Sequence, residues 1–108
     1  MHQQLAGVAE VFVPSIVLGE LYYGAQKSIR VGFNTARVDA FAAHNSVLTC
    51  DMEAARHYGE IKSELRTKGR PIPENDIWIA AIAKQHQLTL ATRDRHFSDV
   101  NGLLIEGW

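Results

Sequence analysis

Apolar residues recur along the chain as short runs and as helical stripes, and the two patterns alternate. Short apolar runs predict strands at residues 10–14, 46–50, 88–92 and 103–105. Apolar residues at helical spacing predict helices at residues 16–27, 33–43, 52–67 and 74–85. Strands that alternate with helices indicate an α/β fold, with a mostly parallel sheet and helices on both of its faces.

Local signals mark where some of these helices begin and end. Ser15 and Asp51 precede two of them and are residue types that cap helix N-termini. Gly69 follows the helix at 52–67, where glycine commonly ends a helix. Because the chain has 108 residues and no stretch resembling an interdomain linker, it predicts a single domain over residues 1–108.

The helix at 74–85 carries the most informative polar residues. It is apolar on nearly every face and should be buried, yet its first turn holds Glu74, Asn75 and Asp76. Free backbone N–H groups stabilise a carboxylate at this position. A carboxylate at the mouth of a buried helix is nevertheless costly unless it binds a partner, and a cation is the natural one. Taken alone, Asp76 is also an ordinary residue for a helix start.

Two further carboxylates are expected at the same edge of the sheet. Glu20 lies on the helix after the first predicted strand, and Asp94 follows the strand at 88–92 together with Thr92. Such sheets bind ligands at the carboxyl ends of their strands, so Glu20, Asp76 and Asp94 can share one crevice. Oxygen ligands of this kind suit Mg²⁺ or Mn²⁺. Singly, Glu20 is also typical of a solvated helix and Asp94 of a turn.

Four basic residues flank this crevice and are candidates for binding a phosphate backbone: Lys68, Arg70, Arg93 and Arg95. They are equally typical of solvated surface charges. The formal net charge of −1 gives no global basic surface, so nucleic-acid binding would depend on a local patch or a metal. The five histidines lack the spacing of a zinc site, and surface or structural roles are expected for them.

Composition bounds the setting of the protein. The chain is 46% hydrophobic and 21% charged, which is ordinary for a globular domain. A single cysteine, Cys50, excludes an intrachain disulfide and favours a reducing cytoplasm. No apolar run approaches the roughly 18–20 residues of a membrane span, and no signal peptide is expected at the start.

Three segments together resemble the PIN-domain family, and most closely its VapC-type toxins of bacterial toxin–antitoxin pairs. The segments are Val13–Ala25, Ile72–Ala81 and Leu90–Phe97, in the family's order and at its approximate separations. The helix start Pro-Glu-Asn-Asp and the strand end Thr-x-Asp are specific in combination. The resemblance covers essentially the whole chain and implies a PIN-like three-layer α/β/α fold.

The resemblance also implies a Mg²⁺- or Mn²⁺-dependent endoribonuclease. Its catalytic metal ligands would be Glu20, Asp76 and Asp94, with support from Thr92, Asn75 and the more distant Asp99. The cation would activate water for attack on phosphorus, and nearby Arg or Lys side chains would stabilise the transition state. The family further implies homodimers and a cognate antitoxin that blocks the site.

The start of the chain departs from the family pattern. Family members begin with a central strand that ends in Asp-Thr-Asn and supplies a metal ligand, whereas no Asp precedes Asp39 here. We therefore expect an N-terminally truncated sheet whose central first strand is missing, with rearranged pairing or strand exchange with a second chain. Three functions stay open: an active ribonuclease, an impaired fragment that dimerises or binds an antitoxin, and a small-molecule phosphoryl hydrolase.

Overall fold

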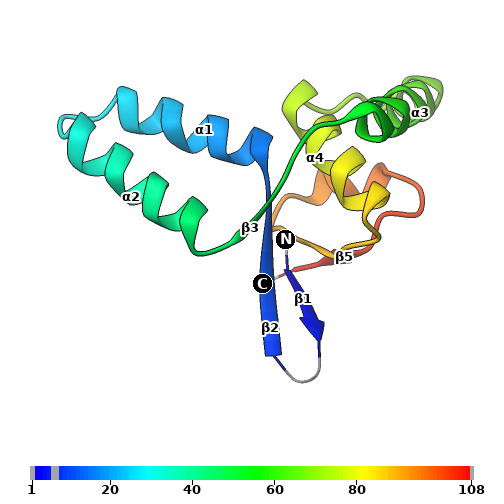
Figure 1. Ribbon diagram of the computed structural model, residues 1–108. Helices are drawn as coiled ribbons and strands as arrows, with labels where there is room; N and C mark the ends of the chain where they lie inside the picture. The colour runs from blue at the N-terminus through cyan, green and yellow to red at the C-terminus, as the bar shows by residue number, and fades with distance from the viewer. Residues whose placement is uncertain (1, 6–7, 108) are drawn as a thin grey trace.

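A computed structural model describes residues 2–5 and 8–107 as alternating strands and helices (Figure 1). In chain order the elements are β1 (His2–Leu5), β2 (Val8–Pro14), α1 (Ser15–Gln26), α2 (Val31–Ala43), β3 (Ser46–Leu48), α3 (Met52–Lys68), α4 (Glu74–Gln85), β4 (Leu90–Ala91), the short 3₁₀ helix η1 (Arg95–Asp99) and β5 (Ile105–Glu106). This order confirms the predicted α/β class. All four α-helices lie where the apolar stripes predict them, whereas the sequence pattern does not predict β1.

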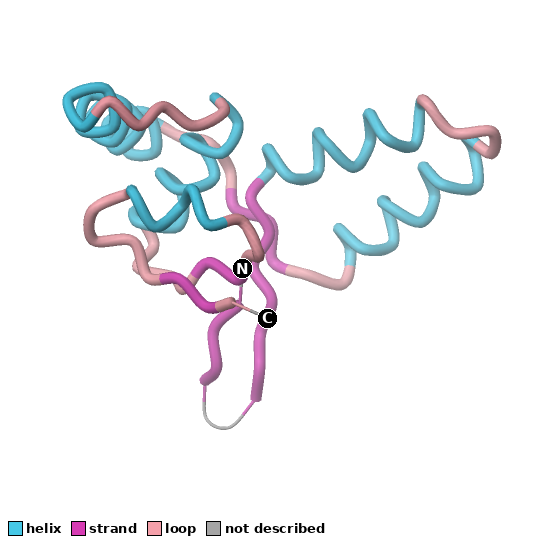
Figure 2. Tube along the Cα trace, turned by 180° about the vertical axis from the view of Figure 1, so that it is seen from behind, coloured by secondary structure: helices cyan, strands magenta, loops and turns pink. Residues whose placement is uncertain are grey.

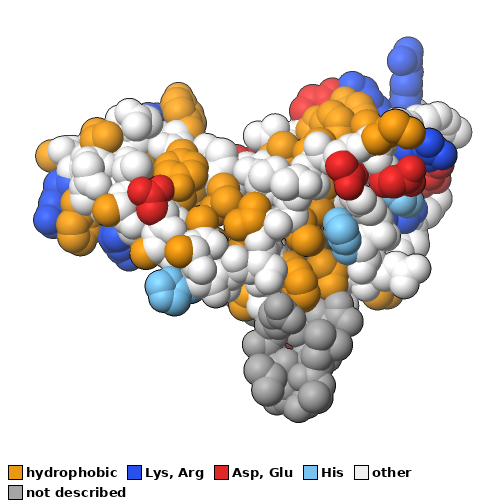
Figure 3. All heavy atoms as spheres, viewed as in Figure 1, with side chains coloured by type: hydrophobic (Ala, Val, Ile, Leu, Met, Phe, Trp, Pro, Cys, Tyr) orange, Lys and Arg blue, Asp and Glu red, His pale blue; other side chains and the backbone are white. Residues whose placement is uncertain are grey.

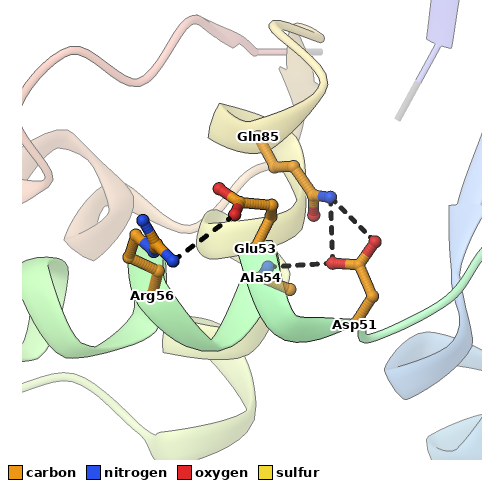
Figure 4. Close-up of polar contacts among 5 residues, drawn as sticks. All are labelled: Asp51, Glu53, Ala54, Arg56 and Gln85. Carbon is orange, nitrogen blue, oxygen red and sulfur yellow. Dashed lines mark hydrogen bonds and ion pairs between the residues drawn. The ribbon is translucent and has the colours of Figure 1, made fainter.

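Local capping links α3 to α4. The Asp51 carboxylate accepts a hydrogen bond from the Ala54 backbone N–H at 3.0 Å, which confirms Asp51 as the N-cap of α3. The side-chain amide of Gln85, the last residue of α4, donates to both oxygens of the same carboxylate (Figure 4). The bond from Ala54 and then that from Gln85 lower the pKa of Asp51. One carboxylate thus ties the start of α3 to the end of α4.

The other two predicted helix boundaries have different outcomes. Gly69 follows α3 with a φ of 68°, so it ends the helix in the left-handed conformation, as predicted. The capping role predicted for Ser15 is wrong, because α1 begins at Ser15 itself. Pro14 occupies the N-cap position in an extended conformation, and no side chain caps this helix.

The described strands form two small sheets. The first has the order β1-β2-β3, in which β1 is antiparallel and β3 parallel to β2, and the second pairs β4 with β5 in parallel. Pairing is therefore mostly parallel, as predicted, but the described strands do not join into one continuous sheet. Figures 1 and 2 show α3, α4 and the β4–β5 sheet on one side of β2, and α1 with α2 on the other.

The core lies where α3 and α4 pack together and against β4 and η1. Its buried members are Ile61, Leu65, Ile72, Ile77, Ile79, Ala80, Ala81, Leu90, Phe97 and Val100. α4 is buried over most of its length, which confirms the expectation from its apolar faces. Burying each large aliphatic side chain contributes about 1.5–3 kcal/mol, so this core fixes the start of α4 firmly.

Helices α1 and α2 form a hairpin that projects from the rest of the molecule, here called the α1–α2 arm (Figure 2). None of the residues described in α2 is buried. Several large apolar side chains of the arm are exposed: Leu21, Tyr23, Ile29, Phe33 and Phe41. Figure 3 shows hydrophobic side chains on the surface of this part of the molecule. Within the described residues, no helix is long and apolar enough to cross a membrane.

Candidate metal centre

Asp76 is placed by the geometry of the chain at the start of α4. Pro73 precedes the helix in an extended conformation, and its carbonyl accepts a hydrogen bond from the Asp76 backbone N–H at 3.0 Å. The next residue, Ile77, is anchored in the core. The Asp76 side chain is therefore held in a half-buried position, 19% exposed, where the positive end of the helix dipole favours its negative charge.

Asp94 comes from the turn after β4. Its backbone N–H donates a hydrogen bond to Thr92 Oγ1 at 3.1 Å, so the Thr92 side chain shapes this turn. The chain then enters η1, where Phe97 is only 3% exposed and packs into the core. This anchor holds the exposed Asp94 and the half-buried His96 beside the start of α4.

Three side chains from these two segments converge. One oxygen of Asp76, one oxygen of Asp94 and one ring nitrogen of His96 all lie within 4.8 Å of one another. Within this group, His96 Nε2 and Asp76 Oδ2 are 2.8 Å apart and share a hydrogen bond. Two carboxylates and an imidazole are a donor set that fits a divalent cation, which would take the place of the proton shared by His96 and Asp76.

The three predicted carboxylates share one groove. Glu20, Asp76 and Asp94 line an open groove of about 410 Å³ between the end of β2 and the end of β4. Its floor is apolar, with Val17, Ile79 and Phe97 among the lining side chains. All three side chains thus line the same groove, but the exposed Glu20 does not belong to the group within 4.8 Å. The roles of the three residues stay predictions.

The residues predicted to support the site are placed differently from one another. Thr92 lines the groove and bonds to the backbone of Asp94. Asn75 is exposed and is not among the residues that line the groove. Asp99 lies at the end of η1, where its backbone carbonyl accepts a hydrogen bond from Lys68 at 2.7 Å. Thr92 therefore lines the groove beside Asp94, whereas Asn75 and Asp99 are not among its lining residues.

The four basic residues also differ in their surroundings. Arg93 and Arg95 line a second hollow, to which Asp94 and other residues of the turn after β4 also contribute. Lys68 binds the backbone of Asp99 and, at 2.5 Å, the side-chain oxygen of Asn101. Arg70 is exposed beyond the end of α3. Of the four basic residues, Arg93 and Arg95 are therefore the two that share a hollow with Asp94.

Glu74, two residues before Asp76, binds the neighbouring helix instead. Its carboxylate accepts hydrogen bonds from the Lys62 ammonium and, at 2.5 Å, from the Tyr58 hydroxyl, both on α3. The Lys62 bond, followed by the Tyr58 bond, lowers the pKa of Glu74. The Tyr58 ring also stacks on Trp78 of α4, with ring centroids 4.0 Å apart. These contacts fasten the first turn of α4 to α3.

His96 is the residue of this group that sequence reasoning missed. The five histidines of the chain are not spaced like the ligands of a zinc site, so a surface or structural role was expected for His96. The available signal was its position two residues after Asp94, just beyond a strand whose end was already expected to face the crevice. That signal becomes specific only when the fold places Asp76, twenty residues earlier in the chain, against it.

The chain is similar to proteins of a known family. A family model described as "PIN domain" matches residues 2–103. Ribonuclease VapC2 of Haemophilus influenzae is 41% identical over 97 residues, which cover 89% of this chain and 74% of that protein. The tRNA(fMet)-specific endonuclease VapC of Salmonella typhimurium is 40% identical with the same coverage.

A solved structure shows the same fold. The chain superposes with a TM-score of 0.86 on VapBC2 from Rickettsia felis, which was solved bound to a DNA fragment from its promoter. The two sequences are 33% identical, and the match covers 92% of this chain and 75% of that one.

Proposed function

We propose that this chain, which belongs to the PIN-domain family, is a VapC-like endoribonuclease. It uses Mg²⁺ or Mn²⁺ to hydrolyse RNA phosphodiester bonds. The observation that carries the proposal is the convergence of Asp76 and Asp94, whose carboxylate oxygens lie within 4.8 Å of each other in a groove that both residues line. Two curated relatives at about 40% identity are named as a ribonuclease and an endonuclease, which supports the same reaction class.

Each carboxylate has a distinct part in this proposal. Asp76 and Asp94 hold the cation, because their oxygens lie close enough to share one ion. Glu20, which lines the groove from α1, completes the coordination or orients the attacking water. Thr92 keeps Asp94 in place through the hydrogen bond to its backbone. When bound, the divalent cation supplies Lewis-acid activation of water and of the scissile phosphate.

The RNA backbone reaches this group past basic side chains. Arg93 and Arg95 flank Asp94, so their guanidinium groups are suited to bind phosphate oxygens and to stabilise negative charge that develops there. Lys68 and Arg70 extend the basic surface on the side of α3. Lys68 already binds Asp99 and Asn101, so its part is the smaller.

The proposal includes protein partners. The solved structure from Rickettsia felis is of VapBC2, which supports a cognate antitoxin for this chain as well. A groove between α1 and α2 offers a binding surface of mixed character for such a partner, with apolar side chains such as Leu21 and Phe41 beside the polar Asn34 and Arg37. The apolar side chains at the outer end of the α1–α2 arm support a homodimer.

The test is cleavage of a short RNA by the 108-residue chain with Mg²⁺ or Mn²⁺ and with EDTA. We expect metal-dependent cleavage that Asp76→Asn lowers about 100-fold or more, because the amide removes a negative ligand but keeps the shape of the side chain. Glu60→Gln, on the exposed surface of α3, is the matched control and should cleave like the wild type.

Three results would count against the proposal. Unchanged cleavage by a folded Asp76→Asn protein would remove the acidic group from the reaction. Metal-dependent hydrolysis of a phosphate monoester without cleavage of RNA would instead indicate a small-molecule phosphoryl hydrolase. Absence of cleavage by well-folded wild type would leave the chain as a binding protein that occupies an antitoxin.

A further inference from the structure

We propose that His96 is a direct metal ligand, so that the centre is a mixed nitrogen and oxygen site that prefers Mn²⁺ to Mg²⁺. This inference rests on the proposed function, because it requires that Asp76 and Asp94 hold a divalent cation. It goes beyond that function because the proposed carboxylate ligands need no histidine, whereas a nitrogen ligand increases the preference for Mn²⁺ over Mg²⁺.

The distances suit shared coordination. Ligand atoms about 2.1 Å from one octahedral ion lie about 3.0 Å apart when adjacent and about 4.2 Å apart when opposite. His96 Nε2 lies 2.8 Å from Asp76 Oδ2, close to the spacing of adjacent ligands. All three donor atoms, including one from Asp94, fall within 4.8 Å, so a small closing movement brings them onto one ion.

The position of His96 is set by packing and not by its bond to Asp76 alone. The neighbouring Phe97 is buried in the core, and the two rings are in contact with centroids 4.9 Å apart. The His96 side chain is 35% exposed, so one edge is open to the solvent while the ring nitrogen faces Asp76. A ring held this way loses little freedom when it binds an ion.

The chemistry of the donor set then predicts the preference. Mg²⁺ strongly favours oxygen ligands and retains water, whereas an imidazole nitrogen favours the later divalent metals. Replacing one oxygen ligand by a histidine nitrogen therefore strengthens binding of Mn²⁺ relative to Mg²⁺. The competing explanation is that His96 only positions the Asp76 carboxylate by a hydrogen bond, in which case no nitrogen touches the ion.

Pulsed electron paramagnetic resonance of Mn²⁺ bound to the untagged protein distinguishes the two explanations. Direct ligation predicts coupling of the Mn²⁺ electrons to a histidine ¹⁴N nucleus. His96→Gln should abolish this coupling and weaken Mn²⁺ binding about tenfold or more, with a much smaller effect on Mg²⁺. His86→Gln is the matched control, because His86 follows α4 about 15 Å along the helix from Asp76.

The outcomes separate this inference from the proposed function. Mn²⁺ binding that depends on Asp76 but shows no ¹⁴N coupling would overturn His96 as a ligand and leave the metal centre intact. Coupling that survives in a folded His96→Gln protein would also overturn it. If Mn²⁺ does not bind, or binds equally well without Asp76, both this inference and the proposed function are overturned. Circular dichroism of each variant checks that the fold is kept.

Discussion

The two carboxylates in the first turn of α4 contact different parts of the molecule, and this difference explains how Asp76 is held in the candidate metal centre. Glu74 is neutralised by Lys62 and bound by Tyr58 on the neighbouring helix. Asp76 faces the groove, where it meets His96 and Asp94. Glu74 thus fastens the turn that presents Asp76, and the negative charge of Asp76 stays available for a cation.

The Glu74–Lys62 pair predicts a pH-dependent stability. The pKa of Glu74 is lowered from 4.5, so its contribution is present above pH 4.5 and is lost as the pH falls through the folded-state pKa. The pKa of Lys62 is raised from 10.5, chiefly by its bond to Glu74, so its contribution is present below pH 10.5 and is lost at higher pH.

Thermal unfolding of Glu74→Gln tests this interpretation. We expect a melting temperature below that of the wild type at pH 7 and a difference that shrinks at pH 3, where the wild-type carboxylate is also being protonated. Glu53→Gln removes an exposed pair with Arg56 at 3.7 Å and should change the melting temperature less. An equal difference at both pH values would show that the pair does not stabilise the turn.

At the residue scale, local chemistry was predictable and tertiary contacts were not. Asp51 and Gly69 act on backbone groups within a few residues of themselves, so their cap positions follow from the sequence. The contact between His96 and Asp76 joins residues twenty apart, and it exists only because two elements meet. The sequence therefore predicts the carboxylates as a group but not the histidine beside them.

At the element scale, the helices were predicted better than the strands. Helical stripes repeat over 12 or more residues, and all four helices have that length. β4 and β5 have two residues each, which is too short for an alternating pattern to define their bounds. The extent of β4 matters for the site, since Thr92 and Asp94 follow directly from its end.

At the scale of the whole molecule, the family resemblance predicted the fold, and pairing of the strands was not predictable. Which strands pair depends on contacts between distant segments, so periodicity alone could not show that the described strands divide into two sheets. The division has a consequence for the site, because the groove with the three carboxylates lies between the end of β2 and the end of β4. The two sheets together define the space in which RNA would bind.

The projecting α1–α2 arm leads to a prediction about assembly. Sedimentation equilibrium should give about 24 kDa, twice the 12.0 kDa of one chain, since exposed apolar side chains on the arm favour association. Phe33→Glu should shift the mass toward 12.0 kDa, because it places a charge in that surface. Met52→Glu, at an exposed position on α3, is the control and should stay dimeric. A monomeric wild type would contradict the homodimer.

Titration calorimetry with Mn²⁺ tests the central claim most directly, because it detects the cation at the acidic group whether or not RNA is cut. The account predicts saturable binding by the wild type and by Glu60→Gln, and loss of that binding in Asp76→Asn and in Asp94→Asn. Binding of equal strength in a folded Asp76→Asn protein, or no binding by a folded wild type, would contradict a metal centre formed by these two aspartates.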